Sequence, residues 1–485
     1  MTRSVVIAGG GPAGLLLAGE LALAGVDVEV IERRNVPPER CDGMAVHARC
    51  LETLDLRGLA APIRDHLFPW PRTPFSLLWL DLDAGSERDL TYGFPQVRLE
   101  AVLAARAEQL GARISRGAEV TAFAQDEDGV TVTVRSAGDE RQVRASYLVG
   151  CDGPDSVVRT LAGITLDGSL PAYYGILGDV TLTDDLHELF DAGPRPGGLF
   201  GALPIEPGKI RLMSIEFDRE PVRDAAPPTA AELAASLGRL TGRVPKIDET
   251  HYISRFGHAT RLADRYRSGR VLVAGDAAHQ LFISGTQGLN TAIQDVMNLG
   301  WKLAAVVNGW ASEELLDTYE AERRPVGARM VRHAEATLTL LHPLTRLTAL
   351  RELFSDLIGI PEVSRRLLRM PTEVRYPLGN DHPLMGTQVP PVDVHTAEAH
   401  RPLAELFHDG RGVLLLSDGV TGDTPARSDR VNVVTVERHP DLDADAVLLR
   451  PDGYVAYAGP VGGALDAALS RWFGAADRAA VGSPA

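Results

Sequence analysis

Residues 4–32 read SVVIAGGGPAGLLLAGELALAGVDVEVIE, and this stretch decides the fold of the chain. A short apolar run ends in the pattern Gly9-x-Gly11-x-x-Gly14, a helical segment follows, and a second apolar run closes on Glu32. Short apolar runs on either side of a helical segment are typical of buried parallel strands. The stretch therefore predicts a βαβ unit at the start of an α/β domain.

Each glycine of this pattern suits a particular task. Gly9 allows a tight turn, Gly11 lets the backbone approach a pyrophosphate, and Gly14 lets the helix pack closely on the strand. The start of the helix offers free N–H groups and the positive end of its dipole to phosphates. Glu32 is placed to accept hydrogen bonds from a ribose 2′-hydroxyl and would repel a 2′-phosphate. We interpret the unit as a dinucleotide site, for which the pattern alone leaves FAD and NAD(P) open.

Composition and charge restrict the class of protein. The chain has 485 residues and 45% apolar content. That is enough for several buried cores, and the length predicts roughly two to four domains. The formal net charge is -16 and the sequence contains no basic run, so we expect neither nucleic acid nor an anionic membrane surface as a partner. A small uncharged or weakly ionised substrate stays open.

The cysteine count and the N-terminus bear on the compartment. The three cysteines, Cys41, Cys50 and Cys151, include no Cys-x-x-Cys spacing. This argues against a disulfide framework, against a zinc or other metal site, and against flavoproteins that work through a cysteine pair. No signal peptide precedes the first strand, and Glu20 interrupts the long apolar run near the N-terminus. We therefore expect a cytoplasmic protein without a membrane span.

Two further segments place acids at the ends of predicted strands. Residues 113–149 are interpreted as antiparallel strands followed by a strand that returns to the parallel sheet, which ends at Asp152. Another strand ends in Gly275-Asp276, and a long helix begins at Gln287. An acid in such a place can hold the ribityl chain of a flavin, and a helix start can direct its positive end at the flavin ring. For Asp152 alone, a role as a helix cap is the simpler interpretation.

The segment between these two acids, residues 173–268, contains further strand patterns. They predict an antiparallel sheet that roofs a substrate cavity. Its apolar residues can line a site for a flat aromatic ligand, or they can simply form core. Beyond the long helix, helical patterns cover about 326–342 and 346–370.

Taken in order, these motifs resemble those of the FAD-dependent aromatic hydroxylases, which are single-component flavoprotein monooxygenases of the p-hydroxybenzoate hydroxylase type. Besides the glycine pattern with Glu32, the stretches that carry the resemblance are Asp152-Gly153, Gly275-Asp276 with His279, Gln287-Gly-Leu-Asn290 and Leu315-Leu-Asp-Thr-Tyr-Glu-Ala-Glu-Arg-Arg-Pro325. The C-terminal stretches Arg375-Tyr-Pro and Leu448-Leu-Arg-Pro-Asp-Gly-Tyr are similar to the branch with an added thioredoxin-like domain. That branch includes aromatic polyketide hydroxylases of antibiotic pathways.

The resemblance implies an α/β fold with three domains. A Rossmann-like FAD-binding domain with trailing helices is expected over 1–172 and 269–372, and an α+β substrate domain with an antiparallel sheet over 173–268. A thioredoxin-like domain is expected over 373–485. The sequence has no cysteine after Cys151, so this last domain cannot perform dithiol chemistry.

The resemblance also implies non-covalent FAD, with NAD(P)H as a transient co-substrate. Gly11, Gly14 and Glu32 would bind the ADP half of FAD. Asp276 would bind the ribityl and pyrophosphate, and Asp152 would support both FAD and passing NAD(P)H. The cofactor-binding residues expected in full are Gly9, Gly11, Pro12, Ala13, Gly14, Glu32, Arg33, Arg40, Gln96, Arg98, Val120, Asp152, Asp276, Gln287, Gly288, Leu289 and Asn290.

In the implied reaction NAD(P)H reduces the flavin, O2 adds to give a C4a-hydroperoxide, and one oxygen transfers to a polycyclic aromatic, polyketide-like substrate. Activation of a phenolate would need a base or an oxyanion stabiliser, for which His47, His258, Tyr174 and Arg211 are candidates. A lone His or Tyr is usually structural, so no catalytic residue is assigned. A monomer and a homodimer both stay open.

One stretch departs from the family pattern. Residues 280–286 read QLFISGT where the family usually has a proline pair and a second glycine. The flavin-facing wall is therefore expected to differ, which leaves Baeyer–Villiger-type oxygen insertion or an oxidative rearrangement open beside hydroxylation. A non-catalytic flavoprotein that sequesters an aromatic compound is a third interpretation. Halogenation ranks lower because the Trp-x-Trp-x-Ile-Pro signature is absent.

Overall fold

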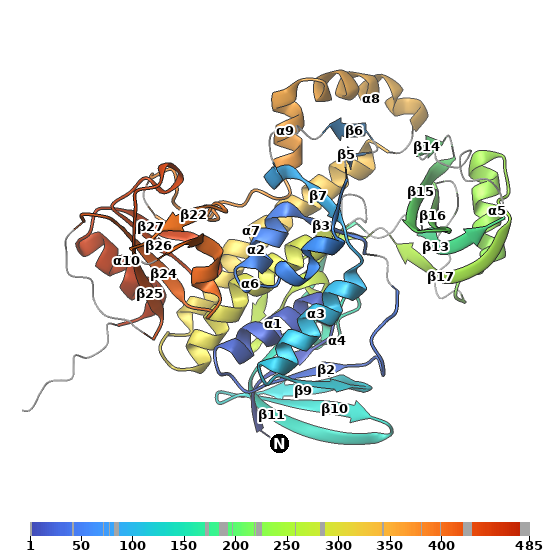
Figure 1. The fold of residues 1–485 in the computed structure, drawn as a ribbon. Coiled ribbons are helices and arrows are strands. Elements are labelled where there is room, and N and C mark those ends of the chain that lie inside the picture. Colours follow the sequence, from blue (N-terminus) through green and yellow to red (C-terminus); the bar gives the residue numbers. More distant parts are fainter. Residues whose placement is uncertain are drawn as a thin grey trace, which may run out of the picture.

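The computed structural model describes residues 2–40, 43–70, 72–76, 78–81, 87–169, 174–183, 193–195, 197–217, 219, 226–257, 259–281, 287–341, 344–379, 381–397, 399–420 and 429–475. In Figure 1 a central α/β body carries a five-stranded sheet at one end and a C-terminal sheet at the other. None of the helices in these ranges combines the length and the apolar content that a membrane span requires.

The central body is built on a mostly parallel sheet. Along it the described strands follow the order β19, β20, β11, β1, β2, β8. Their bounds are β1 (Thr2–Ala8), β2 (Val28–Glu32), β8 (Arg113–Arg116), β11 (Asp139–Gly150), β19 (Arg267–Ser268) and β20 (Val271–Val273). Ala8 of β1 pairs with Ile31 and with Gly150, and Gly150 pairs with Val273, all in parallel register. The carboxyl ends of these strands therefore meet at one edge, which gathers the glycine pattern and both acid motifs.

Residues 113–149 differ in one respect from the antiparallel strands that the sequence predicts. β8 pairs in parallel with β2. The chain reaches β8 through the helix α3 (Gln96–Gln109), and such a helical crossover returns a strand to the sheet in the parallel sense. β9 (Ala118–Gln125), β10 (Val130–Ser136) and the first half of β11 are antiparallel, and the end of β11 joins the parallel sheet as expected.

The glycine pattern leads into α1 (Pro12–Leu23), which contacts both α3 and α6 (Gln287–Val307). Leu15, Leu16 and Leu17 are all buried, and a helix that is apolar on every side must be covered on every side. Pro12 suits the first turn because its missing N–H would have no partner inside the helix. Nearly all of α6 is buried in turn, so these two helices form the centre of the body.

The five-stranded sheet is antiparallel and runs in the order β14, β15, β16, β13, β17. The strands are β13 (Tyr174–Leu182), β14 (Gly193–Arg195), β15 (Gly198–Glu206), β16 (Lys209–Glu216) and β17 (Ile247–Gly257). One face is covered by α5 (Ala230–Thr241), whose Leu233 and Leu237 pack on Val180 and Leu212. The other face carries Leu177, which packs with side chains at the end of α7 (Glu314–Thr339).

The helices that follow α6 correct the sequence-based bounds. In place of helices over 326–342 and 346–370, the structure has α7 over Glu314–Thr339, α8 over Leu344–Ile358 and α9 over Pro361–Arg369. Pro325 lies inside α7, so it does not mark the start of that helix. The second predicted helix is divided before Pro361, because a proline disfavours helical conformation in the residue before it.

The C-terminal sheet consists of β24 (Gly412–Ser417), β25 (Val431–Val436), β26 (Ala446–Leu449) and β27 (Val455–Gly459), with the helix α10 (Gly463–Phe473). β24 and β25 are parallel, and the other pairs are antiparallel. Trp472 and Phe473 of α10 pack against Trp301 of α6, each with ring centroids 6.3 Å apart. The C-terminal sheet is therefore packed onto the central body.

Short elements complete the described part of the chain. The helices are α2 (Ala48–Asp55) and α4 (Val157–Leu161), and 3-10 turns cover Ala61–His66, Glu87–Asp89, Gly275–Ala277, Leu403–Phe407 and Pro440–Leu442. The strands are β3 (Ala45–His47), β4 (Phe68–Trp70), β5 (Arg72–Phe75), β6 (Leu78–Asp81), β7 (Thr91–Gly93), β12 (Leu166–Ser169), β18 (Thr260–Ala263), β21 (His279–Gln280), β22 (Asp393–His395) and β23 (His400–Pro402).

Candidate functional site

The glycine loop at the edge of the sheet has three different environments. Gly9 has a φ of 103°, which favours glycine, and a side chain there would overlap the carbonyl oxygen of Cys151. A side chain at Gly14 would overlap the carbonyl oxygen of Gly9. By contrast, a Cβ on Gly11 would meet no atom within 4 Å in the part of the chain that the structure describes. Two of the glycines are therefore required by the fold, and the third faces open space.

Glu32 ends β2 beside this loop and is buried. Its Oε2 accepts a hydrogen bond from the Gly10 N–H at 2.5 Å, and its Oε1 accepts from both the backbone N–H and the Nε of Arg34 at 2.8 Å. Burial on its own raises the pKa of the Glu32 carboxyl, but the bonds from Arg34 and Gly10 outweigh it and lower the pKa. The carboxylate is thus held ionised at the end of the strand, and sequence reasoning missed its partner Arg34.

Asp152 accepts hydrogen bonds at the start of α4, whose N-cap residue is Ser156. It accepts a hydrogen bond from Ser156 Oγ at 2.5 Å and from the Val158 N–H at 3.1 Å. The next turn brings the two acid motifs together, because the Arg159 guanidinium donates to the carbonyl of Ala277 at 3.2 Å. The simpler interpretation of Asp152 as a cap therefore describes its observed contacts, and its role toward a cofactor stays a prediction.

The turn at Gly275 lies between the starts of two helices. Gly275 has a φ of 63°, and a Cβ there would lie 3.3 Å from the Ala13 Cβ of α1 and 3.2 Å from the Ala292 Cβ of α6. The loop after β1 and the turn after β20 are thereby brought into contact. The sequence placed both motifs at the carboxyl edge of one sheet, and the packing of Ala13 and Ala292 explains why they also touch.

Asp276 follows directly and is exposed. Its carboxylate accepts no hydrogen bond from the residues that the structure describes, although it lies 3.7 Å from the place of a Cβ on Gly288. Desolvation of this carboxyl by the surrounding protein raises its pKa, and the charge of His279 acts in the opposite direction. An acid that is accessible and unpartnered beside the start of α6 is available to a ligand.

The first turn of α6 is tied to distant segments. The Gln287 amide donates to His333 Nδ1 of α7 at 2.8 Å, and the His47 N–H donates to Asn290 Oδ1 at 2.8 Å. Gln287 and Asn290 are buried, whereas Gly288 and Leu289 are partly exposed. Gly288 and Leu289 are therefore the members of this set that a cofactor can reach. The unusual stretch 280–286 lies outside the described residues from Phe282 onward.

Behind the turn lies a buried group of three side chains, to which the sequence analysis assigned no role. Asp295 of α6 accepts from Arg323 Nε at 2.7 Å and from His279 Nε2 at 2.6 Å, and all three side chains have 0% exposure. Burial alone raises the pKa of the Asp295 carboxyl, but the charges of Arg323 and His279 and their hydrogen bonds lower it. The signal in the sequence is Asp295, the one acidic residue of α6.

The arginines among the expected cofactor-binding residues are dispersed. Arg33 and Arg98 are exposed, the latter on the first turn of α3, whereas Arg40 approaches Asp179 of β13 at 3.7 Å. Asp179 is buried and is bonded twice by Arg211 of β16, at 2.7 and 3.0 Å. Asp179 and Leu177 lie on one side of β13, away from α5, so this charged pair belongs to the face toward the central body.

Two other predicted cofactor residues have protein contacts that explain their positions. The Gln96 amide donates to Glu100 Oε1 at 2.9 Å along α3. Val120 is buried in β9, in a core with Val132 and Val134. Neither observation tests a role toward FAD. Among the described residues, no group of His, Cys, Asp and Glu is suited to hold a metal ion.

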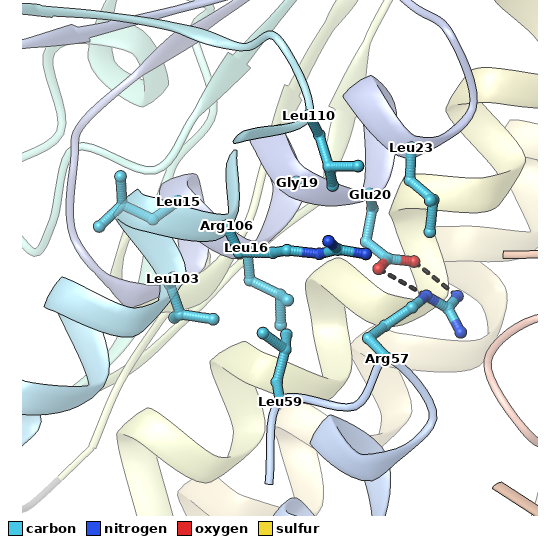
Figure 2. A pocket seen from close by; sticks show the side chains of 10 residues that line it. All are labelled: Leu15, Leu16, Gly19, Glu20, Leu23, Arg57, Leu59, Leu103, Arg106 and Leu110. Atoms are coloured by element: carbon cyan, nitrogen blue, oxygen red, sulfur yellow. Dashed lines mark hydrogen bonds and ion pairs between the residues drawn. The ribbon is translucent and has the colours of Figure 1, made fainter. Parts of the chain in front are cut away.

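Figure 2 shows a small cavity between α1 and α3, beside the ion pair of Glu20 and Arg57. Its volume of about 10 Å³ leaves room for about one water. A wider cavity of about 750 Å³ lies at the surface between Arg267 and the start of α7. Neither cavity is lined by Gly11, Asp276 or the first turn of α6, so neither belongs to the candidate site.

Comparison with known proteins extends these observations. A family model described as an FAD binding domain matches residues 2–334, and one described as aromatic-ring hydroxylase, C-terminal, matches residues 382–476. The chain is 40% identical over 499 residues to 12-dehydrotetracycline 5-monooxygenase/anhydrotetracycline 6-monooxygenase of Streptomyces rimosus, over 98% of this chain and 99% of the relative. It is also 40% identical over 484 residues to dialkyldecalin synthase of Streptomyces rugosporus, over 98% and 100% of the two chains.

The solved structures lead to the same family. The structure of the anhydrotetracycline hydroxylase OxyS from Streptomyces rimosus matches with a TM-score of 0.92 and 39% identity, over 98% of this chain and 100% of that chain. Family model, sequence and structure agree over nearly the whole chain. This protein therefore belongs to the FAD-dependent aromatic-ring hydroxylases and is an FAD-dependent monooxygenase.

Proposed function

We propose that the chain oxygenates a polycyclic aromatic, polyketide-like substrate with FAD, NAD(P)H and O2, most simply as a hydroxylase in the tailoring of a secondary metabolite. The observation that carries the proposal lies at one sheet edge, where, among the described residues, Gly11 faces open space and Asp276 has no hydrogen-bond donor. The chain is similar along its length to an anhydrotetracycline monooxygenase. The three domains at the boundaries 1–172 with 269–372, 173–268 and 373–485 are part of this proposal.

The described residues fit FAD in three places. The free N–H groups at the start of α1 and the open backbone at Gly11 suit the pyrophosphate. Glu32, held ionised by Arg34, suits the hydroxyls of the adenosine ribose. Asp276 suits the hydroxyls of the ribityl chain, because its carboxylate has no other donor among the described residues.

The chemistry that bound FAD supplies is oxygen transfer, which we propose goes through a C4a-hydroperoxide after reduction by NAD(P)H. The chain's own part is binding, orientation and exclusion of water. α6 has 21 residues, and its N-terminal dipole at Gly288 favours negative charge on the pyrimidine side of the ring. The inner face of the five-stranded sheet, with Leu177 and the Asp179–Arg211 pair, is proposed as the roof over the substrate.

One alternative stays in competition. Baeyer–Villiger-type insertion or oxidative rearrangement uses the same cofactor, and residues 280–286 are where a difference in the flavin wall is expected. The relative named dialkyldecalin synthase is as similar to this chain as the anhydrotetracycline monooxygenase is, so overall similarity does not fix which reaction is catalysed. The third interpretation, a flavoprotein that only sequesters an aromatic compound, is not supported, because the chain is a monooxygenase.

The test is NADPH and NADH consumption by the purified, flavin-loaded protein, with and without a panel of polycyclic phenols and quinones. Hydroxylation predicts consumption that rises with a ligand and a product heavier by one oxygen, which is labelled when 18O2 is supplied. The same added mass with loss of a ketone carbonyl would support oxygen insertion. Flavin binding without ligand-dependent consumption or product would contradict the proposed class of substrate.

A further inference from the structure

The turn Gly275–His279, which carries Asp276, is attached at both of its ends to one oxygen atom. The Gly275 N–H donates to Asp295 Oδ2 at 3.4 Å, and His279 Nε2 donates to the same oxygen at 2.6 Å. Asp276 itself has no contact of this kind with the described residues. The position of its carboxylate is therefore set by the backbone of the turn, and the turn is set by Asp295.

Arg323 in turn fixes the orientation of Asp295. Its Nε donates to Asp295 Oδ1 at 2.7 Å, and its remaining nitrogens donate to the Thr291 carbonyl at 3.2 Å and to the Tyr376 hydroxyl at 3.0 Å. A guanidinium is a rigid planar fork, so a shift at one of its partners is passed to the others. Thr291 follows Asn290, so the same fork also reaches the first turns of α6.

Tyr376 belongs to the C-terminal part of the chain. Its N–H donates to the Gly386 carbonyl at 2.8 Å, and the Gly386 N–H donates to the Val455 carbonyl of β27 at 2.9 Å. The Tyr376 ring packs on Tyr454, with centroids 4.4 Å apart. The guanidinium of Arg450 lies 5.4 Å from the centroid of the same ring. The hydroxyl that Arg323 uses is thus positioned by the C-terminal sheet.

Arg450 anchors this arrangement to both sides. It is fully buried, bonds Asp452 at 2.6 and 3.0 Å within its own sheet, and bonds Glu322 of α7 at 2.8 and 2.9 Å. Glu322 directly precedes Arg323. Well-packed apolar residues often stabilise a contact at least as much as a buried ion pair does. We therefore assign to the Arg450–Glu322 pair the task of fixing the orientation of the C-terminal sheet relative to α7.

We propose that Arg450, Tyr376, Arg323 and Asp295, here called the docking relay, make the C-terminal sheet a positioning element for the flavin site. The C-terminal sheet fixes Tyr376, Tyr376 fixes the Arg323 fork, and the fork fixes Asp295 and with it the turn that presents Asp276. These are positioning residues, because none of them needs to touch the cofactor. The inference rests on the proposed role of Asp276 toward FAD, and it gives the C-terminal sheet a function that needs no cysteine.

The experiment compares Tyr376→Phe with Tyr457→Phe. The first removes the hydroxyl that accepts from Arg323. The second removes a partly buried hydroxyl of β27, which donates to the Pro460 carbonyl at 2.6 Å and lies outside the relay. For each full-length apo-protein, FAD affinity is measured by fluorescence titration, and the visible circular dichroism of the bound flavin and the thermal midpoint of the apo-protein are recorded.

The relay predicts that Tyr376→Phe weakens FAD binding roughly fivefold and changes the dichroism of the flavin, while its apo-protein melts within about 2 °C of Tyr457→Phe. Equal FAD affinity and equal dichroism in the two variants would overturn the inference while leaving the flavoprotein intact. Failure of the wild-type protein to bind FAD would instead overturn the proposed function, so the two failures are distinguishable.

A second measurement needs no variant and decides the matter if Tyr376→Phe does not fold. Hydrogen exchange of the wild-type apo-protein is followed at increasing, sub-denaturing urea. The relay predicts that the Gly275 and Ala278 amides lose protection together with β24 and β26 of the C-terminal sheet. Loss of protection in the sheet while the turn stays protected would contradict it.

Discussion

Asp295 and Asp276 lie on opposite sides of the same turn and have opposite environments. Asp295 has 0% exposure and is bonded by Arg323 and His279, whereas Asp276 is exposed and has no donor among the described residues. Gly14 and Gly11 repeat the contrast, one packed against backbone and one facing open space. The difference teaches that one set of residues, here called the closed layer and including Asp295 and Gly14, holds the edge of the sheet in place. A second set, here called the open layer and including Asp276 and Gly11, is left free for a ligand.

The largest expected difference between the two layers is in the free energy of unfolding of their variants. Asp295→Ala leaves the buried Arg323 without its carboxylate partner and should cost about 3–5 kcal/mol of unfolding free energy. Asp276→Ala removes a carboxylate that accepts no hydrogen bond from the described residues, and it should change stability by less than about 0.5 kcal/mol. Urea denaturation of both apo-proteins measures this. Similar losses in the two variants would remove the distinction on which the comparison depends.

A second prediction concerns His333 of α7, which is buried and accepts a hydrogen bond from Gln287 at the start of α6. Burial, with the charge of Arg329, lowers the pKa of His333 from 6.5 to about 4. The unfolded chain therefore binds a proton at higher pH than the folded chain. The stability that the neutral His333 contributes is fully present above pH 6.5 and is lost as the pH falls toward 4. At 1.36 kcal/mol per pH unit the loss is about 3 kcal/mol.

The measurement is the unfolding free energy at pH 7 and at pH 4.5. His333→Gln should lose less stability across this interval than the wild-type protein, whereas the exposed His66 provides the control, because His66→Gln should keep the wild-type loss. An unchanged pH dependence in His333→Gln would show that His333 is not held neutral by its surroundings.

The smallest effect is expected at Lys302, which shares a buried cluster with Arg450, Glu322 and Asp452. Burial lowers the pKa of Lys302 to about 8, against the attraction of Glu322. Its folded pKa is below that of the unfolded chain, so stability rises as pH increases from about 8 toward 10.5. Lys302→Met should change stability at pH 7 by no more than about 1 kcal/mol, because Glu322 keeps Arg450 as a partner.

Thermal unfolding at pH 7 and pH 9.5 tests this prediction. The gain between the two values should disappear in Lys302→Met and persist in Lys246→Met, which changes an exposed lysine. A large loss at pH 7 would mean that the ammonium is a required part of the buried cluster, and it would extend the closed layer to this residue.

The parts of the site that the sequence predicts are those set by local chain geometry. Gly9, Gly14 and the acid at the end of β20 follow from a strand, a turn and a helix within a few residues of one another. The pairing of Asp295 with Arg323 joins residues 28 positions apart, and that of Glu322 with Arg450 joins residues 128 apart. No local pattern specifies which of many arginines a buried acid meets, so these contacts needed the folded chain.

The errors in the fold prediction have the same origin. Residues 113–116 alternate like an antiparallel strand, but the helix before them returns the chain in parallel beside β2. Pro325 is a helix breaker by local rules, yet α7 runs through it, with the neighbouring Glu322 and Arg323 held by buried partners on both sides. Packing and topology, which are set by distant segments, decided both cases.

The most direct test of the open layer is the FAD affinity of Gly11→Ala beside that of the wild-type protein. A methyl group at residue 11 meets no atom of the described residues within 4 Å, so the apo-protein should keep the wild-type thermal midpoint. If the FAD pyrophosphate lies against this backbone, the affinity should fall roughly tenfold or more, a loss of about 1.4 kcal/mol. Wild-type affinity in Gly11→Ala would contradict the account, because the open space at Gly11 would then not be where the cofactor binds.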